Sequence, residues 1–187
     1  MKTYQATLRG TSPYSQSRHY TIEKLDKELH DAYDRRTWRN RMHIDDSGVV
    51  FIPPMAIKNC LSEAAKFLGI QIKGKAKATY TKHFEAGLMV IEPISLGIKA
   101  ADVQSETLFV PASGKRGDGR RVDRVFPFIP SGWTGITTMH VIDETITEDV
   151  LREHLEEAGK LIGIGRFRPR NNGYYGRFQV EEFKQVS

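Results

Sequence analysis

The chain has 187 residues, a formal net charge of +5 and one cysteine. This length suits one domain, residues 1–187, with a full hydrophobic core or a core carrying an elaborate insertion. The single Cys60 excludes an intramolecular disulfide, and the lack of any apolar run of about 20 residues predicts no transmembrane helix. Residues 1–4 begin a strand and lack the apolar stretch of a signal peptide, so we expect a soluble, cytoplasmic protein without a membrane partner.

The first quarter of the chain predicts a strand followed by a basic helical insertion. Residues 2–9 alternate apolar and polar side chains, which is typical of a strand with one buried face. After a polar loop, residues 22–41 predict a helix. The apolar positions of that helix are Leu25, Leu29 and Tyr33. We interpret residues 11–48 as one insertion. The basic surface of this insertion either contacts nucleic acid or is simply solvated. The residues considered for contact are Arg35, Arg36, Trp38 and Arg39.

Residues 49–69 predict a short buried strand and an amphipathic helix. Residues 49–52 form an apolar run of strand length, and Pro54 fits the first turn of a helix because its missing N–H is not needed there. Gly69 fits the end of that helix. The apolar stripe at helical spacing consists of Ile57, Cys60, Leu61, Ala64, Phe67 and Leu68. We therefore expect Cys60 to be a small buried residue.

Residues 70–130 predict four strands around a basic loop. The strands are expected over residues 80–84, 87–91, 107–110 and 124–129. Between the last two strands lies a segment rich in glycine and arginine. We interpret residues 111–124 as a flexible loop that becomes ordered on binding. Its basic residues considered for binding are Lys115, Arg116, Arg120 and Arg121.

The last third of the chain predicts a strand, a helix and a final strand. Residues 135–142 read as a strand, and Thr145 followed by Glu148 resembles a capping box at the start of the helix. Gly163 fits the C-terminal cap of that helix. The final strand is expected over residues 175–183.

Residues 163–178 carry the clearest functional signal in the chain. Four glycines, four arginines and two adjacent tyrosines share this segment, which contains no acid. Glycine lets a backbone approach a ligand closely, arginine binds phosphate in a bidentate manner, and tyrosine can stack on an unstacked base. The pattern predicts a loop that grips a nucleic-acid backbone. The alternative is a hairpin that turns at residues 171–173 and pairs Phe167 with Phe178.

The order of the expected core elements predicts the fold class. A strand, a helix, further strands, a second helix and a last strand indicate an α+β protein. More specifically, they indicate an elaborated ferredoxin-like βαββαβ domain with insertions after the first strand and in the middle. RNA-recognition modules (RRM) have the same order of elements.

With this order, the chain resembles the RAMP superfamily of CRISPR-associated proteins, and within it the Cas7-like backbone subunits. The resemblance rests on the strand-to-helix passage at residues 51–61, the glycine-rich segment 163–178, and a ferredoxin-like order with a basic insertion. It implies binding of single-stranded RNA through the sugar–phosphate backbone, largely without reading sequence. It also implies a homo-oligomer or a subunit of a nucleoprotein complex. The resemblance extends to compact relatives from a phage or a mobile element. The residues it places near the RNA backbone are Lys58, Arg166, Arg168, Arg170 and Arg177.

The leading hypothesis is therefore sequence-tolerant binding of single-stranded nucleic acid, RNA rather than DNA, without a cofactor. Arginines would capture phosphates electrostatically, and aromatic rings would stack on bases. The expected phosphate contacts are Arg18, Arg166, Arg168, Arg170 and Arg177, together with the basic loop. The expected stacking residues are Tyr174, Tyr175 and Trp38.

A metal-independent endoribonuclease is the second hypothesis. Some RAMP relatives cleave RNA with a histidine as general acid or base. His19 lies in a polar loop beside Arg18 and Tyr20, where an arginine can stabilise phosphate charge. Alternatively, Arg18 and His19 only contact phosphate. The sequence contains no metal-ligand spacing, phosphate-binding Walker loop or nucleophile elbow, so we expect no metal.

The third hypothesis is a protein-interaction or assembly module that caps a larger nucleoprotein complex. It rests on the acidic helix over residues 147–161, which would lie opposite the basic face. Such a module would bind a protein partner tightly and free RNA weakly.

Overall fold

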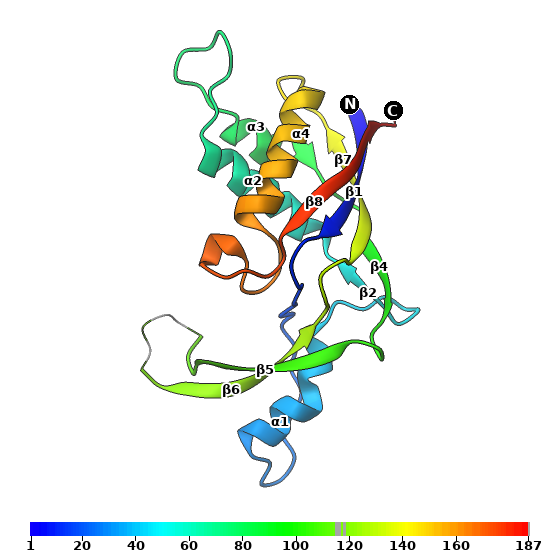
Figure 1. Ribbon diagram of the computed structural model, residues 1–187, viewed down its shortest axis with the longest axis vertical. Coiled ribbons are helices and arrows are strands. Elements are labelled where there is room, and N and C mark those ends of the chain that lie inside the picture. Colours follow the sequence, from blue (N-terminus) through cyan, green and yellow to red (C-terminus); the bar gives the residue numbers. More distant parts are fainter. Residues whose placement is uncertain (115–116, 118, 187) are drawn as a thin grey trace.

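The computed structural model describes residues 1–114, 117 and 119–186. Within these ranges the fold is mixed α/β, with four α-helices and with strands arranged in three antiparallel sheets. The two termini lie together at one end of the molecule, and α1 lies at the opposite end (Figure 1). A helix-covered sheet occupies the end near the termini, and a smaller part built around a hairpin occupies the other.

The main sheet has the strand order β3-β7-β1-β8, and every neighbouring pair is antiparallel. Its strands are β1 (Lys2–Gly10), β3 (Leu88–Met89), β7 (Thr134–Val141) and β8 (Phe178–Gln185). Alternate side chains of β1 enter the core, as the sequence pattern predicts. These fully buried side chains are Tyr4, Ala6 and Leu8.

Three helices cover one face of the main sheet (Figure 1). They are α2 (Pro54–Leu68), α3 (Thr81–Ala86) and α4 (Glu148–Glu157), and a π-helical turn over Ala158–Ile162 extends α4. As predicted, Pro54 lies in the first turn of α2, and Gly69 ends that helix with a φ of 58° in the left-handed region. The prediction that Cys60 is buried is also confirmed.

The smaller part of the molecule holds two two-stranded sheets and α1. Its strands are β2 (Val49–Ile52) paired with β4 (Ile94–Lys99), and β5 (Gln104–Pro111) paired with β6 (Arg121–Phe128). α1 (His30–Thr37) and a 3-10 turn (Trp38–Arg41) pack against β6. The backbone N–H of Val125 on β6 donates a 2.8 Å hydrogen bond to the carboxylate of Asp34, which fixes α1 onto the hairpin.

The helix expected over residues 22–41 is wrong in its first part, because helical structure begins at His30. Leu25 and Leu29, two of its three expected apolar positions, are 62% and 76% exposed. A short polar segment that buries no apolar face gains too little to form a stable helix. Helical spacing alone therefore predicted a helix longer than the observed one.

The strand expected over residues 80–84 is also wrong, since α3 occupies this region. Tyr80 and Phe84 are both buried. A spacing of four places two residues on one face of a helix and equally on one face of a strand, so the pattern could not distinguish them. The structure adds β4, which the sequence analysis did not predict.

Several boundaries in the last third differ from expectation. Thr147, not Thr145, caps α4, because its hydroxyl accepts a 3.4 Å hydrogen bond from the N–H of Val150. The last strand begins at Phe178 rather than at residue 175. Gly163 does end the helical segment, as predicted, with a φ of 69°.

The apolar stripe predicted for α2 is not buried throughout. Phe67 continues that stripe, yet its side chain is 54% exposed.

Candidate nucleic-acid groove

The glycine-rich segment forms a compact loop that is tied to the chain after β1. The N–H of Arg166 donates to the carbonyl of Ser15 at 2.9 Å, and the N–H of Gly176 donates to the carbonyl of Pro13 at 2.7 Å. Phe178 pairs with Gly10, so the expected pairing of Phe167 with Phe178 in a hairpin is wrong. In Figure 1 this loop lies between the helical layer and the β5–β6 hairpin.

The glycines of this loop permit close backbone contacts. A Cβ atom on Gly173 would lie 1.7 Å from the carbonyl oxygen of Phe167, a distance that no side chain can occupy. The backbones of Gly173 and Phe167 therefore cross in close contact. At this backbone crossing Phe167 has a φ of 54°, which is unusual for a bulky residue. Such strained positions persist where the surrounding contacts determine them, and they cluster at functional sites.

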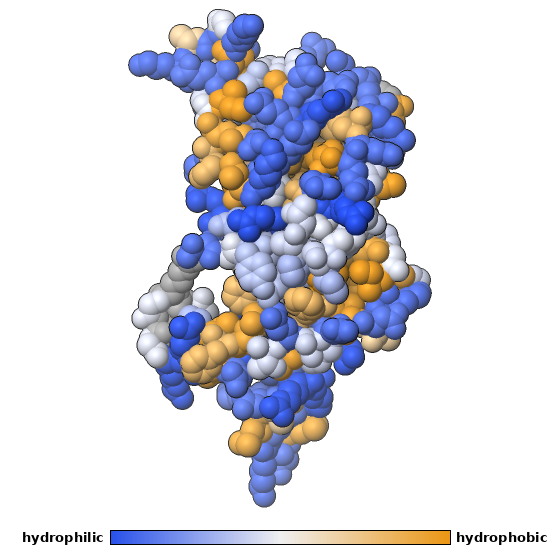
Figure 2. All heavy atoms as spheres, in the orientation of Figure 1, coloured by the Kyte–Doolittle hydropathy of each residue, from blue (hydrophilic) through white to orange (hydrophobic). Residues whose placement is uncertain are grey.

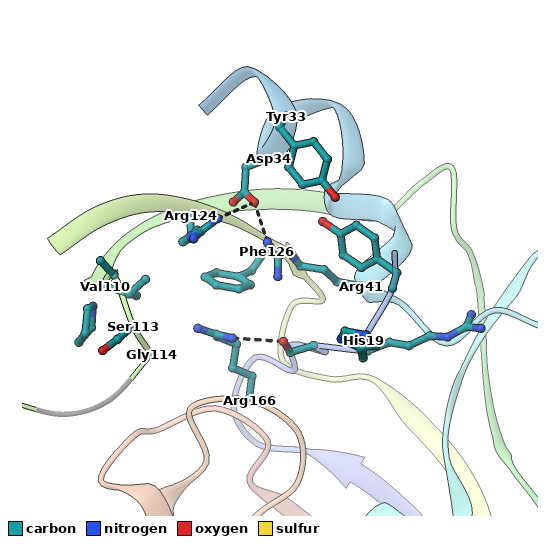
Figure 3. Close-up of a pocket in the computed structure, with 15 residues that line it drawn as sticks. His19, Tyr33, Asp34, Arg41, Val110, Ser113, Gly114, Arg124, Phe126 and Arg166 are labelled. Atoms are coloured by element: carbon teal, nitrogen blue, oxygen red, sulfur yellow. Dashed lines mark hydrogen bonds and ion pairs between the residues drawn. The ribbon is translucent and has the colours of Figure 1, made fainter. Parts of the chain in front are cut away.

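Two adjoining cavities lie between the glycine-rich loop and the β5–β6 hairpin. The first has a volume of about 590 Å³ and is lined by the 3-10 turn, the segment from Ser17 to Tyr20 and β6 (Figure 3). The second has a volume of about 720 Å³ and shares Val110, Pro111, Gly114 and Arg166 with the first. The space-filling view shows the surface hollowed between the hairpin and the body of the molecule (Figure 2). We call the two cavities together the basic groove. Its arginines are Arg18, Arg41, Arg121, Arg124, Arg166 and Arg170.

Arg166 stands where the two cavities meet. Its guanidinium carbon lies 3.6 Å from the ring centroid of Phe126 and 4.4 Å from that of Phe167. One of its terminal nitrogens donates to the hydroxyl of Ser17 at 3.2 Å. Burial, and then repulsion from Arg41 and Arg124, lower the pKa of Arg166 to about 10. The side chain therefore remains a cation at neutral pH, and the ring contacts fix its position.

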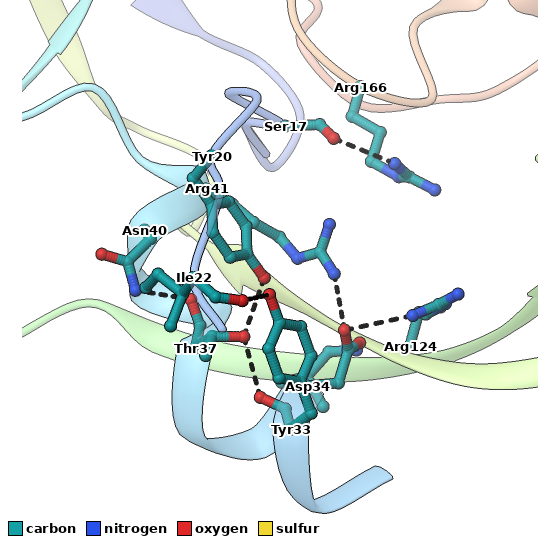
Figure 4. Close-up of polar contacts among 11 residues, drawn as sticks. Ser17, Tyr20, Ile22, Tyr33, Asp34, Thr37, Asn40, Arg41, Arg124 and Arg166 are labelled. Carbon is teal, nitrogen blue, oxygen red and sulfur yellow. Dashed lines mark hydrogen bonds and ion pairs between the residues drawn. The ribbon is translucent and has the colours of Figure 1, made fainter. Parts of the chain in front are cut away.

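A single buried carboxylate, that of Asp34, holds two more arginines in the first cavity. Its Oδ1 accepts hydrogen bonds from Arg41 at 2.7 Å and from Arg124 at 3.3 Å (Figure 4). Among the described residues, Asp34 is the one acidic side chain that lines this cavity, and none lines the second cavity. Two guanidiniums thus share one carboxylate while Arg166 lines the same cavity, and the groove carries an excess of positive charge.

Four arginines predicted from the sequence do line the groove: Arg18, Arg121, Arg166 and Arg170. Arg121 lies on β6 rather than in a loop, because the loop expected over residues 111–124 is shortened by strand at both ends. Arg170 also approaches a carboxylate oxygen of Glu63 on α2, at 4.0 Å.

Other predicted cations have partners away from the groove. Arg168 forms a 2.7 Å ion pair with Glu63, and Arg36 forms a 2.8 Å ion pair with Glu28. The guanidinium of Arg177 donates to the carbonyls of Lys160 and Tyr174. Predicted cations that line neither cavity of the groove also include Arg35, Arg39 and Arg120, and Arg120 borders a separate cavity of about 350 Å³. Lys115 and Arg116 lie outside the described residues.

Lys58 belongs to the helical layer rather than to the groove. Its ammonium group donates to the backbone carbonyls of Phe84 and Glu85 and to the hydroxyl of Ser62. These three bonds use its three N–H donors. Burial lowers the pKa of Lys58. The side chain therefore stabilises the packing of α3 on α2 and lines neither cavity of the groove.

The predicted stacking residues differ in exposure. Trp38 is only 6% exposed, and the guanidinium of Arg39 covers its ring at 4.3 Å. Tyr175 is 4% exposed and donates its hydroxyl hydrogen bond to Glu106 on β5. Tyr174 is 54% exposed and therefore presents a ring to solvent. Of the three, Tyr174 alone can stack on a base without rearrangement.

Sequence reasoning did not select Asp34, Arg41 or Phe126 as site residues, and it included Arg124 only as the last residue of the basic loop. Arg41 is the last residue of the expected basic helix, so composition could have included it. No sequence pattern indicates that Asp34 meets Arg124 across 90 positions of chain. The pairing depends on α1 packing against β6, which is a tertiary contact.

The open face of the main sheet offers no aromatic platform. On β1 and β7 the residues opposite the helices pair as Thr3 with His140, Gln5 with Thr138, and Thr7 with Ile136. RNA-recognition modules stack bases on aromatic residues of the central strands. The central strands here carry no Phe, Tyr or Trp on that face.

Two kinds of feature are absent from the described ranges. None of the helices there could span a lipid bilayer. No three His, Cys, Asp or Glu side chains in those ranges gather into a set of metal ligands.

Comparison with known proteins identifies fold relatives only. No family model and no curated protein matches the chain. A chain in the cryo-EM structure of the Type III-B Cmr-beta bound to cognate target RNA matches with a TM-score of 0.58 and 12% identity. That match covers 100% of this chain and 61% of the other, so the protein spans less than two thirds of that relative.

The crystal structure of Cmr6 from Pyrococcus furiosus matches with a TM-score of 0.52 and 10% identity, covering 95% of this chain and 97% of that one. The chain has the fold of these two proteins. At identities of 12% and 10% the likeness concerns the fold and not the residues of a site.

Proposed function

We propose that the protein binds single-stranded RNA along the basic groove, holding the sugar–phosphate backbone with little dependence on sequence. The observation that carries the proposal is the gathering of Arg41, Arg124 and Arg166 in one cavity that continues into a second, where Arg41 and Arg124 share the single carboxylate of Asp34. Arginines placed in this way neutralise phosphates, and phosphate contacts position a strand without reading its bases.

The fold supports the same assignment. The order β3-β7-β1-β8, with α2 and α4 as crossover helices, agrees with a ferredoxin-like core, to which we assign the chain. On this assignment residues 11–48 and the β5–β6 hairpin are insertions of one RAMP-like domain, and both contribute walls of the groove. The fold likeness to a protein described as bound to cognate target RNA favours RNA over DNA as the ligand.

The partner proposed beyond RNA is a nucleoprotein complex in which this chain is a subunit. The outer face of α4 supports an interaction role, because it carries Glu148, Asp149, Glu153, Glu156 and Glu157. Pull-down from a host extract, with and without nuclease, tests this role. Protein partners that remain after nuclease treatment support a direct contact, and partners that vanish indicate tethering through nucleic acid.

Binding is expected to weaken steeply with salt. If Arg41, Arg124 and Arg166 each neutralise one phosphate, the slope of log affinity against log salt is about −2, at about −0.7 per phosphate on a single strand. Fluorescence anisotropy with a labelled single strand of about 30 nucleotides measures it, since one site spans roughly 4–16 nucleotides. The same strand as DNA gives the RNA preference. A slope near zero would contradict electrostatic capture.

Metal-independent cleavage is the second candidate, and the position of His19 favours it. The exposed His19 lines the first cavity together with Arg41 and Arg166, so a general base and phosphate-binding cations share one site. If the site is catalytic, RNA incubated with the protein in EDTA is cut, and His19→Ala abolishes cutting while retaining most of the affinity. RNA that stays intact over a panel of structured and unstructured strands rejects cleavage and leaves binding as the function.

A further inference from the structure

The charges of the first cavity are not balanced by the residues around it. Arg41 and Arg124 share the carboxylate of Asp34, and Arg166 has a hydroxyl, that of Ser17, as its hydrogen-bond acceptor. Arg41 and Arg166 also lie on the same ring, with guanidinium carbons 4.9 Å and 3.6 Å from the centroid of Phe126. Arg41, Arg124 and Arg166 against the one carboxylate of Asp34 leave an excess of about two positive charges, counting each arginine as fully protonated, and the exposed Arg18 also lines the cavity.

Donors in the same place lack acceptors. Among the described residues, three arginines have a buried Nε without a hydrogen-bond partner, and two of them, Arg41 and Arg166, line this cavity. A buried donor without a partner keeps an uncompensated desolvation penalty, so an incoming acceptor that these side chains can turn to reach is favoured. The cavity therefore has more positive than negative charge, and two of its donors have no acceptor.

A nucleic-acid strand contains internal phosphodiesters and can carry a terminal phosphate. These two groups differ in negative charge and in the number of hydrogen-bond acceptors. A phosphodiester inside the strand carries one negative charge and has two unbridged oxygens. A terminal phosphate carries about −1.5 to −2 charges at pH 7 and offers three strong acceptor oxygens. The terminal group compensates the excess of Arg41, Arg124 and Arg166 over Asp34 and offers one oxygen for each of these arginines, whereas an internal phosphodiester compensates only about half of that excess.

We propose that the first cavity binds the terminal phosphate of a nucleic-acid strand, so that the protein recognises a phosphorylated strand end. The second cavity then receives the adjoining nucleotides beside Arg121 and Arg170, where internal phosphodiesters meet singly placed arginines. This inference deepens the proposed function and rests on it. The first cavity, about 590 Å³, lies within the range of 300–1,000 Å³ usual for small-ligand sites.

Competition binding with unlabelled RNA of one sequence tests the inference. Four strands are compared: one with hydroxyl groups at both ends, one with a 5′-phosphate, one with a 3′-phosphate, and one whose end phosphate is methylated. The methyl ester keeps the phosphate and removes one charge. We expect one phosphorylated end to bind about tenfold or more tightly than the hydroxyl end, since charge-assisted contacts are strong. The methyl ester should lose most of that gain, and the 5′ and 3′ strands show which end enters.

Arg124→Gln should reduce the gain from the terminal phosphate to about twofold or less, because one of three cations is lost. Arg152→Gln is the matched control, since Arg152 on α4 also pairs with one carboxylate, that of Glu148 at 3.0 Å, and lines neither cavity. Equal affinities of all four strands for the unmodified protein would overturn the inference and leave RNA binding intact. If no strand binds at low salt, the proposed function itself fails.

Discussion

Replacing Arg166 with methionine is expected to weaken the binding of single-stranded RNA by about 10- to 100-fold. A hydrogen bond to a charged group contributes about 1.5–3 kcal/mol, and about 1.4 kcal/mol corresponds to a factor of ten in affinity. Arg166 is the arginine shared by both cavities, so its removal affects every strand that crosses between them. Anisotropy titrations at a fixed low salt concentration measure the loss.

The salt dependence separates a lost phosphate contact from a damaged fold. Arg166→Met should make the log–log salt slope less steep by about 0.7, the value for one phosphate on a single strand. Arg152→Met is the matched control, because Arg152 also lies over a phenylalanine ring, at 5.0 Å from the centroid of Phe183, and also has a buried Nε without a partner. This control should retain both the affinity and the slope.

Arg166→Lys tests how much of the effect depends on geometry. Lysine keeps the positive charge but lacks the planar group that lies against Phe126 and Phe167. The variant should therefore keep the salt slope and show an affinity between those of Arg166→Met and the unmodified protein. Full affinity in Arg166→Met, with a folded protein, would contradict the placement of RNA in the groove.

Sequence patterns predicted most of the core because its elements obey simple periodicities. Alternation identified β1, and the proline, the apolar stripe and the terminal glycine identified α2. They failed where two periods coincide, as at Tyr80 and Phe84, and where apolar residues remain exposed, as at Leu25 and Leu29. The periodicity of apolar residues predicts a helix or strand correctly when that element buries its apolar face.

The candidate site was predicted only in part, because composition locates cations but not their partners. The arginines of residues 163–178 share one pattern in the sequence, yet Arg166 lies in the groove while Arg168 pairs with Glu63 on α2. Tyr174 and Tyr175 are neighbours, yet only one is exposed. These differences arise from contacts between distant parts of the chain, which no local window contains.

Replacing Gly176 with alanine is expected to destabilise the protein by about 3 kcal/mol. Gly176 has a φ of 71°, and a Cβ atom there would lie 1.9 Å from the carbonyl oxygen of Ile164. A left-handed conformation costs an ordinary residue about 1–2 kcal/mol, and overpacking adds about 1–3 kcal/mol. For a chain of this size the loss corresponds to a decrease in Tm of about 6–12 °C, which thermal unfolding followed by circular dichroism measures.

Two other glycines separate the causes of that loss. Gly48 has a φ of 78° with nothing within 4 Å of its Cβ position, so Gly48→Ala should show the conformational cost alone, about 1–2 kcal/mol. Gly119 also has open space and no positive φ, so Gly119→Ala should change stability by less than about 0.5 kcal/mol.

The excess loss in Gly176→Ala over Gly48→Ala then measures the backbone crossing in the glycine-rich loop. The carbonyl of Gly176 accepts a 3.0 Å hydrogen bond from the N–H of Ile164, and its own N–H donates to Pro13. The crossing therefore fixes both ends of the segment that carries Arg166. Equal losses of stability in Gly176→Ala and Gly48→Ala would mean that the glycine-rich loop rearranges to accommodate the new methyl group. RNA affinity would then depend on the arginine alone and not on the rigidity of the glycine-rich loop that presents it.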